Sequence, residues 1–158
     1  MPMPCRVAVA VLVVLLGIPV FAPDRAGVGM LLAQEAARTD KRQLVAENMF
    51  LTEAEAKAFW PIYDAYQEDL DRIYNRIARV ISEYVRAYMD NTLTDEQARA
   101  LTAEVLDIDE TEAAMAKTYA AKLDAVLSGK KVARYLQIER KIRAHFRNQL
   151  AEKIPLVK

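Results

Sequence analysis

Apolar residues recur every three or four positions between residues 53 and 89, the spacing that gives a helix one apolar face. This stretch has no glycine and one proline, Pro61, which we expect to kink the helix rather than end it because the apolar pattern resumes at once. The sequence therefore predicts one long amphipathic helix. Its stripe consists of Leu70, Ile73, Tyr74, Ile77, Val80, Ile81, Tyr84, Val85 and Tyr88.

Three further segments carry a helical pattern. Residues 39 to 50 predict a short first helix, and a helix that begins after residues 90 to 92 has a thinner stripe, with the acidic run at 107 to 112 expected on its wet face. A last helix, from about 130 to 152, is expected to bury Val132, Tyr135, Ile138, Ile142, Phe146 and Leu150.

Each of the three main helices is preceded by Leu and a hydroxyl residue. Thr52 with Glu55, and Thr94 with Gln97, have the reciprocal spacing of a capping box, in which each side chain accepts from a free backbone N–H group. Leu51, Leu93 and the pair Leu127 and Ser128 complete the three starts. They predict where the helices begin.

Helix length constrains the fold class, which we predict to be all-α. The chain has only 4 Gly and 6 Pro, too few for a turn-rich all-β fold. A helix of more than thirty residues is about 50 Å long, wider than a globule of this size. We therefore expect an elongated antiparallel hairpin of three to four helices whose exposed apolar stripes are covered in an intertwined homodimer.

The N-terminal region has the layout of a secretory signal peptide. Arg6 precedes an uncharged apolar run at residues 7 to 22, followed by small residues. We expect cleavage after Ala33, with Ala22 as a second candidate, so that 1–33 is the signal peptide and 34–158 a single helical domain. The alternative is an uncleaved anchor, although the run is short for a bilayer of about 30 Å.

Residues 93 to 97, LTDEQ, match the LTxxQ motif in full, and the chain resembles the Spy/CpxP family, in which this motif opens a long helix. LTEAE at 51 to 55 has Glu in place of Gln, and LSGKK at 127 to 131 keeps only the Leu and the hydroxyl. The resemblance implies a periplasmic, curved, four-helix antiparallel dimer. It also implies an ATP-independent chaperone, an inhibitor of envelope-stress signalling or a metal-responsive sensor. The alternative is that Leu before a cap is an ordinary hydrophobic staple.

Enzyme chemistry finds no support in the residue pattern. Cys5 lies in the expected signal peptide, His145 is the single histidine, and no glycine-rich loop precedes a helix, so thiol catalysis, catalytic triads and phosphate cradles lack their residues. A transition-metal site would need more His or Cys ligands, and the run at 107 to 112 lacks a calcium loop. We expect no enzyme activity, no cofactor and no metal site.

The second and third long helices have net charges of opposite sign. Residues 95 to 124 carry eight acidic and three basic side chains, a net of −5, whereas residues 130 to 147 carry seven basic side chains against Glu139. The two helices could pair through these charges, or both faces could be solvated. Since the whole chain has 22 basic and 22 acidic residues, we expect no nucleic acid partner.

The remaining candidate is an apolar surface that binds unfolded or client proteins. The sequence suggests a patch near the helix ends and Pro61, formed by Met49, Phe50, Phe59, Trp60 and Met89. Alternatively, Phe59 and Trp60 close the end of the bundle. A second function class is a regulatory subunit that docks on the periplasmic domain of a membrane sensor.

Overall fold

The computed structural model describes residues 40–152 and 154–157, and these residues contain helices and no strand. A helical segment at 40–49 precedes α2 (Glu53–Met89), α3 (Asp95–Asp124) and α4 (Gly129–Ala151). Residues 40–158 form one compact unit. The predicted all-α class is confirmed, whereas the predicted signal peptide lies outside the described residues.

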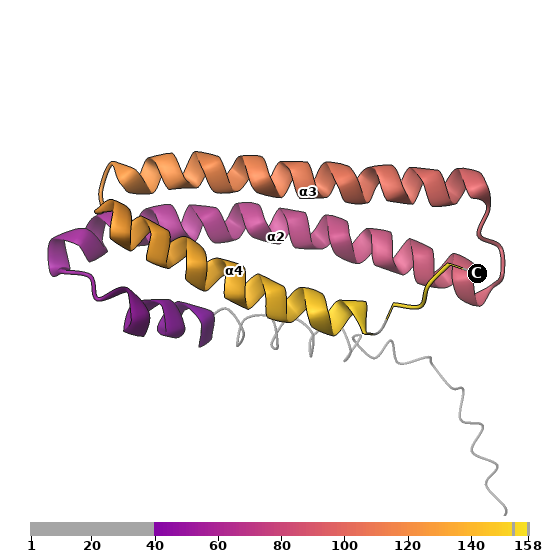
Figure 1. The fold of residues 1–158 in the computed structure, drawn as a ribbon, viewed down its shortest axis with the longest axis horizontal. Coiled ribbons are helices and arrows are strands. Elements are labelled where there is room, and N and C mark those ends of the chain that lie inside the picture. Colours follow the sequence, from indigo (N-terminus) through magenta and orange to yellow (C-terminus); the bar gives the residue numbers. More distant parts are fainter. Residues whose placement is uncertain (1–39, 153, 158) are drawn as a thin grey trace, which may run out of the picture. The chain divides into compact units, whose positions relative to one another are not determined.

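The helices α2 and α3 lie side by side and run in opposite directions (Figure 1). Two contacts fix this direction, because the higher-numbered residue of α2 meets the lower-numbered residue of α3. Arg76 Nε donates to Glu104 Oε1 at 2.9 Å, and Tyr119 donates its hydroxyl hydrogen to Asp69 Oδ2 at 2.6 Å. Asn91, with φ of 53°, makes the turn between the helices, a conformation that Asn tolerates better than most residues.

All three predicted helix starts are confirmed as N-caps. Thr52 Oγ1 accepts from the Glu55 backbone N–H at 3.3 Å while the Glu55 carboxylate accepts from the Thr52 N–H at 2.8 Å. The same reciprocal bonds join Thr94 and Gln97 at 3.2 and 3.1 Å. Ser128 is the N-cap of α4 but makes no side-chain capping bond.

The α2 helix continues through Pro61, as the sequence predicted. A proline has no N–H to donate, so the preceding turn lacks one helical hydrogen bond. The apolar face nevertheless continues on both sides of it, because the buried residues of α2 follow one another at steps of three, four or seven. They are Phe59, Tyr63, Tyr66, Leu70, Ile73 and Val80.

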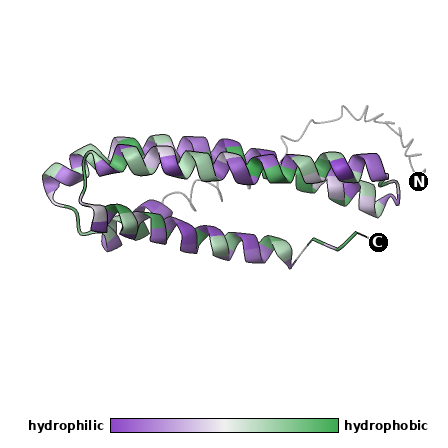
Figure 2. Ribbon diagram, turned by 45° about the horizontal axis from the view of Figure 1, so that its top comes forward, coloured by the Kyte–Doolittle hydropathy of each residue, from purple (hydrophilic) through white to green (hydrophobic). Residues whose placement is uncertain are grey.

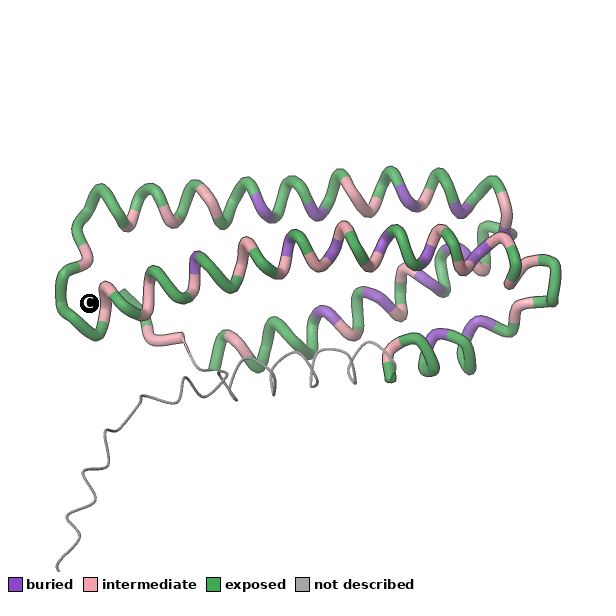
Figure 3. Tube along the Cα trace, turned by 180° about the vertical axis from the view of Figure 1, so that it is seen from behind, coloured by how far each residue is buried: buried purple, intermediate pink, exposed green. Residues whose placement is uncertain are grey.

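The core is dense in one half of this unit and thin in the other. The proximal half contains segment 40–49, the start of α2, the end of α3 and the start of α4, and most of the buried residues gather there (Figure 3). Its cluster consists of Val45, Met49, Phe59, Tyr63, Tyr66, Leu70, Tyr119, Leu123, Leu127, Val132 and Tyr135. The distal half, where α2 ends and α3 begins, has a smaller cluster of Ile73, Val80 and Ile108.

The buried face of α4 differs from the prediction. Val132 and Tyr135 are buried as expected, but Phe146 is exposed, and the charged residues Glu139 and Arg143 are buried in its place. Glu112 is likewise buried, so the wet face predicted for the run at 107 to 112 is wrong at its last residue. These charged side chains occupy the interior because they find partners of opposite charge there.

Candidate interaction surface

A layer of charged side chains between α3 and α4 extends from the interior, where Glu112 and Arg143 lie, to the surface, where Asp109 and Arg147 lie. The buried Arg143 guanidinium donates to Glu112 Oε1, and Arg147 donates to the other oxygen of Glu112 at 2.7 Å and to Asp109 at 2.9 Å. The opposite charges of the two helices therefore pair here within one chain, which was one of the two predicted alternatives. A polar residue at a core position fixes the register of packed helices, and Glu112 is in such a position.

A second buried carboxylate, Glu139, lies about one turn before Arg143 in α4. Gln67 Nε2 donates to Glu139 Oε1 at 3.0 Å, while Lys41 Nζ lies 2.9 Å from Glu139 Oε2, an ion pair in which that oxygen accepts no hydrogen bond. Burial, and then the charge of Glu139, raise the pKa of Tyr135 well above its usual range. The carboxylate is thus neutralised by a cation inside an aromatic cluster.

Neither carboxylate forms a catalytic group with the histidine. His145 is exposed, and its ring Nε2 lies 3.1 Å from Gln149 Nε2 on the same helix. Glu112 and Glu139 are instead paired with Arg143 and Lys41. A buried ion pair of this kind adds specificity of packing more than net stability, so the polar layer is best understood as a structural element.

The predicted apolar patch does not form one exposed surface. Met49 and Phe59 are buried in the proximal core, and Trp60 is half-buried with the Arg42 guanidinium 4.2 Å above its ring. Phe50 and Met89 are 71% and 75% exposed, but they flank opposite ends of α2, a helix about 55 Å long. Phe59 belongs to the proximal core and Trp60 packs against it, so packing within the bundle, as in the alternative interpretation, describes both better than an exposed patch does.

An apolar groove of about 280 Å³ opens in the distal half between α2, α3 and the end of α4. Val105 and Phe146 line it and are 44% and 38% exposed, and the polar layer bounds it with Asp109, Arg143 and Arg147. Figure 2 shows that hydrophobic and hydrophilic residues continue to alternate along the helices. The other lining residues are Tyr74, Ile77, Val80, Ile81, Ile108, Leu150, Ala151 and Ile154.

A second recess of about 570 Å³ lies beside the LTDEQ motif. Leu93 and Gln97 from the motif line it together with Arg79 and Glu104. A hydrogen bond from Arg76 lowers the pKa of Glu104, so this carboxylate stays charged at the wall of the recess. This recess is therefore mixed in polarity, whereas the 280 Å³ groove is mainly apolar.

Sequence reasoning named some groove residues as parts of stripes but did not recognise the groove. The available signal was a difference in helix length, since α2 has 37 residues and α4 has 23. At about 1.5 Å per residue, a third helix that starts with α2 must stop about 20 Å before α2 ends. The stripe beyond that point has no third helix to cover it.

Comparison of the chain with protein-family models, with curated proteins and with solved structures finds no match. The resemblance to Spy/CpxP proteins therefore stays a prediction. Within residues 40–152 and 154–157, no helix is both long and apolar enough to span a membrane. Those residues also contain no group of three or more His, Cys, Asp or Glu side chains placed to hold a metal ion.

Proposed function

We propose that this protein is a non-enzymatic, periplasmic binding protein that holds unfolded or partly folded client proteins, as Spy/CpxP chaperones do. The observation that carries the proposal is the distal groove, where apolar side chains of α2 and α3 stay partly exposed. Exposed apolar area of this kind binds apolar segments without a fixed sequence.

The composition of the groove favours weak and reversible binding. Burying one large apolar side chain contributes about 1.5–3 kcal/mol, and a groove of about 280 Å³ accommodates only one or two such side chains. One or two such side chains contribute about 1.5–6 kcal/mol in all, so the dissociation constants would be millimolar or weaker once ordering costs are subtracted. A client could therefore leave without ATP hydrolysis.

The proposal includes the arrangement that the resemblance implies. In it, the cleaved chain is exported to the periplasm, the long helices form an elongated hairpin, and two copies associate as a homodimer. Three features support it: the complete LTDEQ motif, the two capping boxes and the antiparallel contacts between α2 and α3. A second copy and a client would compete for the same apolar side chains.

The test is suppression of aggregation of a model client that unfolds on heating or on dilution from denaturant. We expect the protein to slow aggregation at stoichiometric amounts, and the double variant Val105→Gln with Phe146→Gln to lose most of this effect. Leu44→Gln is the matched control, because Leu44 is 44% exposed, as is Val105, but lies in the other half.

Four outcomes are informative. Loss of activity in the groove variant alone supports the proposal, and equal loss in both variants contradicts the assignment to the groove. Failure of the wild-type protein to slow aggregation excludes the chaperone function. Saturable one-to-one binding to a sensor's periplasmic domain, with no effect on aggregation, would favour the regulatory subunit instead.

A further inference from the structure

Segment 40–49 packs against α2 and α4 through two buried apolar side chains and through polar contacts of its first turn. Val45 and Met49 point into the proximal core and are fully buried, in one cluster with Phe59 and Tyr135. One turn earlier, Lys41 Nζ lies 2.7 Å from Gln67 Oε1 of α2 and 2.9 Å from Glu139 Oε2 of α4. The segment therefore presents an amphipathic face, basic at its first turn and aliphatic beyond it.

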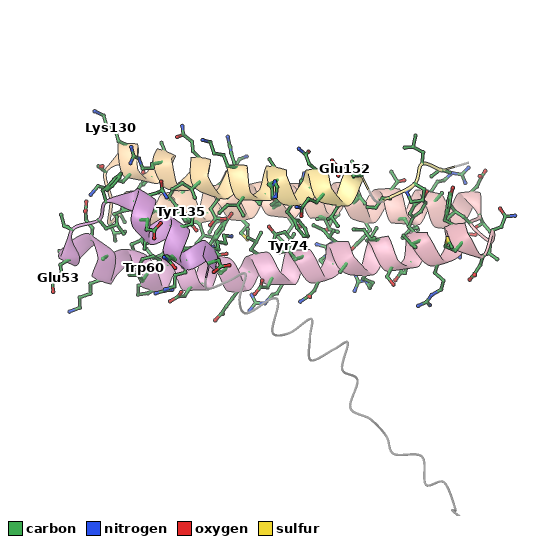
Figure 4. The ribbon with its side chains drawn as sticks, turned by 90° about the horizontal axis from the view of Figure 1, so that it is seen from below. Glu53, Trp60, Tyr74, Lys130, Tyr135 and Glu152 are labelled. Carbon is green, nitrogen blue, oxygen red and sulfur yellow. The ribbon has the colours of Figure 1, made fainter. Side chains whose placement is uncertain are left out.

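The surface of α2 and α4 that segment 40–49 contacts is complementary to it: acidic side chains lie opposite its basic residues, and apolar side chains lie opposite its apolar ones. Asp64 pairs with Arg42, whose guanidinium also lies over the ring of Trp60, and the buried Glu139 receives Lys41. Lys41 supplies the one ion pair that Glu139 makes within the described part of the chain. Figure 4 shows Trp60 and Tyr135 in the part of the bundle along which segment 40–49 runs.

The connection from this segment to α2 is strained. Phe50 has φ of 47°, a left-handed conformation that glycine usually provides just after a helix ends. Two cations of α4 hold it there, since Lys131 Nζ donates to the Phe50 carbonyl at 3.1 Å and Arg134 NH1 to that of Asn48 at 3.2 Å. Release of the segment would relieve this strain.

We propose that the surface between α2 and α4 is a binding groove for an amphipathic helix, and that segment 40–49 occupies it as an internal competitor. The ligand is a helix of a partner protein that repeats the pattern of Lys41, Arg42, Val45 and Met49. Two adjacent basic residues are followed by aliphatic ones four and eight positions after the first. Charge complementarity with Asp64 and Glu139 selects this helix over a purely apolar one.

Exchange of one helix for another is feasible because the polar contacts are replaced rather than lost. When Lys41 leaves, Glu139 either receives the lysine of the incoming helix or becomes hydrated, so no charge stays buried alone. Short terminal segments open locally more easily than long packed helices do. This groove is separate from the distal groove, so the two proposals stand independently.

The experiment uses a fluorescently labelled peptide of residues 40–50, with blocked ends, added to the purified full chain. We expect saturable binding by anisotropy, and at least tenfold tighter binding to the Lys41→Gln protein, whose own segment is loosened. The Lys41→Gln peptide should bind at least tenfold more weakly than the wild-type peptide. Gln43→Glu is the matched control in both protein and peptide, because it changes the charge by the same amount on the outward face.

The possible results either support or overturn the proposal. Absence of peptide binding to both the wild-type and the Lys41→Gln protein would overturn it, and so would equal effects of Lys41→Gln and Gln43→Glu. Circular dichroism of each variant checks that the helices remain folded. If native mass spectrometry shows dimers that the peptide converts to monomers, the groove receives the segment of a second copy, and the partner helix is overturned.

Discussion

In both halves of the molecule α2 packs against α3, but the two halves differ in what covers the apolar face of this helix pair. In the proximal half, segment 40–49 and α4 add a third side, and rings from three elements meet there, with Phe59 5.2 Å from Tyr135 and Tyr66 5.1 Å from Tyr119 between centroids. In the distal half α4 ends, and Val105 and Met89 remain exposed. The spacing of apolar residues is therefore not sufficient for burial, since burial also needs a covering element of matching length.

This difference predicts that the proximal half supplies most of the stability, whereas the client binding that we propose depends on the distal groove. Large buried rings contribute both apolar area and edge-to-face contacts, whereas a partly exposed valine contributes little to folding. Substitutions in the two halves should therefore have opposite profiles. Truncation of a buried proximal side chain should lower the free energy of unfolding by several kcal/mol, whereas truncation of a partly exposed side chain in the distal groove should lower it by about 1 kcal/mol or less.

The largest difference is expected between two phenylalanines. Phe59→Ala should lower the free energy of unfolding by about 3–5 kcal/mol, because a fully buried ring leaves a cavity among three neighbouring aromatic rings. Phe146→Ala, at a ring 38% exposed, should lower it by about 1 kcal/mol. Urea unfolding followed by circular dichroism measures both, and equal losses would contradict the division into two halves.

The polar layer at the boundary of the halves should give the next largest effect. Glu112→Leu should lower the free energy of unfolding by about 3 kcal/mol, because it leaves the buried Arg143 without its carboxylate. The double variant Glu112→Leu with Arg143→Leu should recover most of this loss, since it removes the isolated charge as well. A double variant as unstable as the single one would show that the pair contributes more than packing specificity.

The helix starts should give a smaller effect. Thr94→Ala should lower the free energy of unfolding by about 1 kcal/mol, because the Thr94 hydroxyl accepts from the Gln97 N–H. Ser128→Ala should change it by less than about 0.5 kcal/mol, because Ser128 makes no side-chain capping bond. The ratio of the two losses, measured by urea unfolding, is the test, and a larger loss at Ser128 would contradict it.

The smallest effect concerns pH and distinguishes the two capping boxes. A hydrogen bond from Lys131 lowers the pKa of Glu55 to about 2, whereas the distal box has the uncharged Gln97 in this position. The folded pKa is depressed, so the contribution of Glu55 is present above pH 4.5 and is lost as the pH falls toward 2. The effect is small because the side chain is 24% exposed and solvent screens the pair.

The measurement is the difference in unfolding free energy between the wild-type protein and Glu55→Gln. Gln keeps the capping bond but cannot pair with Lys131 as an anion, so this difference should shrink between pH 4.5 and 2. Glu53→Gln is the control, since Glu53 lies in the same helical turn and carries the same charge. A difference that does not change with pH would exclude the ion pair as its cause.

Much of the fold could be predicted from local sequence. Three helices begin after Thr52, Thr94 and Ser128, and at Thr52 and Thr94 the side-chain hydroxyl accepts from a free backbone N–H group. The two residues that replace the Gln of the LTxxQ motif in the incomplete copies are in contact. Glu55 and Lys131 occupy the position of Gln97 in the two incomplete copies, and their side chains pair with each other.

The burial of charge and the location of the groove depended on tertiary packing. Nothing local to Glu112, Glu139 or Arg143 marks them as buried, because their desolvation is offset by partners that are distant in sequence. Tertiary packing also explains Met49 and Phe59, which were predicted to be part of an exposed patch but are core residues. Composition shows which side chains are apolar, but only the arrangement of the covering helices shows which remain exposed.

The account depends most on the claim that clients bind at the distal groove. Amide hydrogen exchange of the protein, with and without a saturating unfolded client, tests this claim directly. We predict slower exchange on client binding in residues 77–81, 105–108 and 143–151, with exchange in residues 59–73 unchanged. Protection confined to the proximal half, or no protection in the distal half at saturation, would contradict the account.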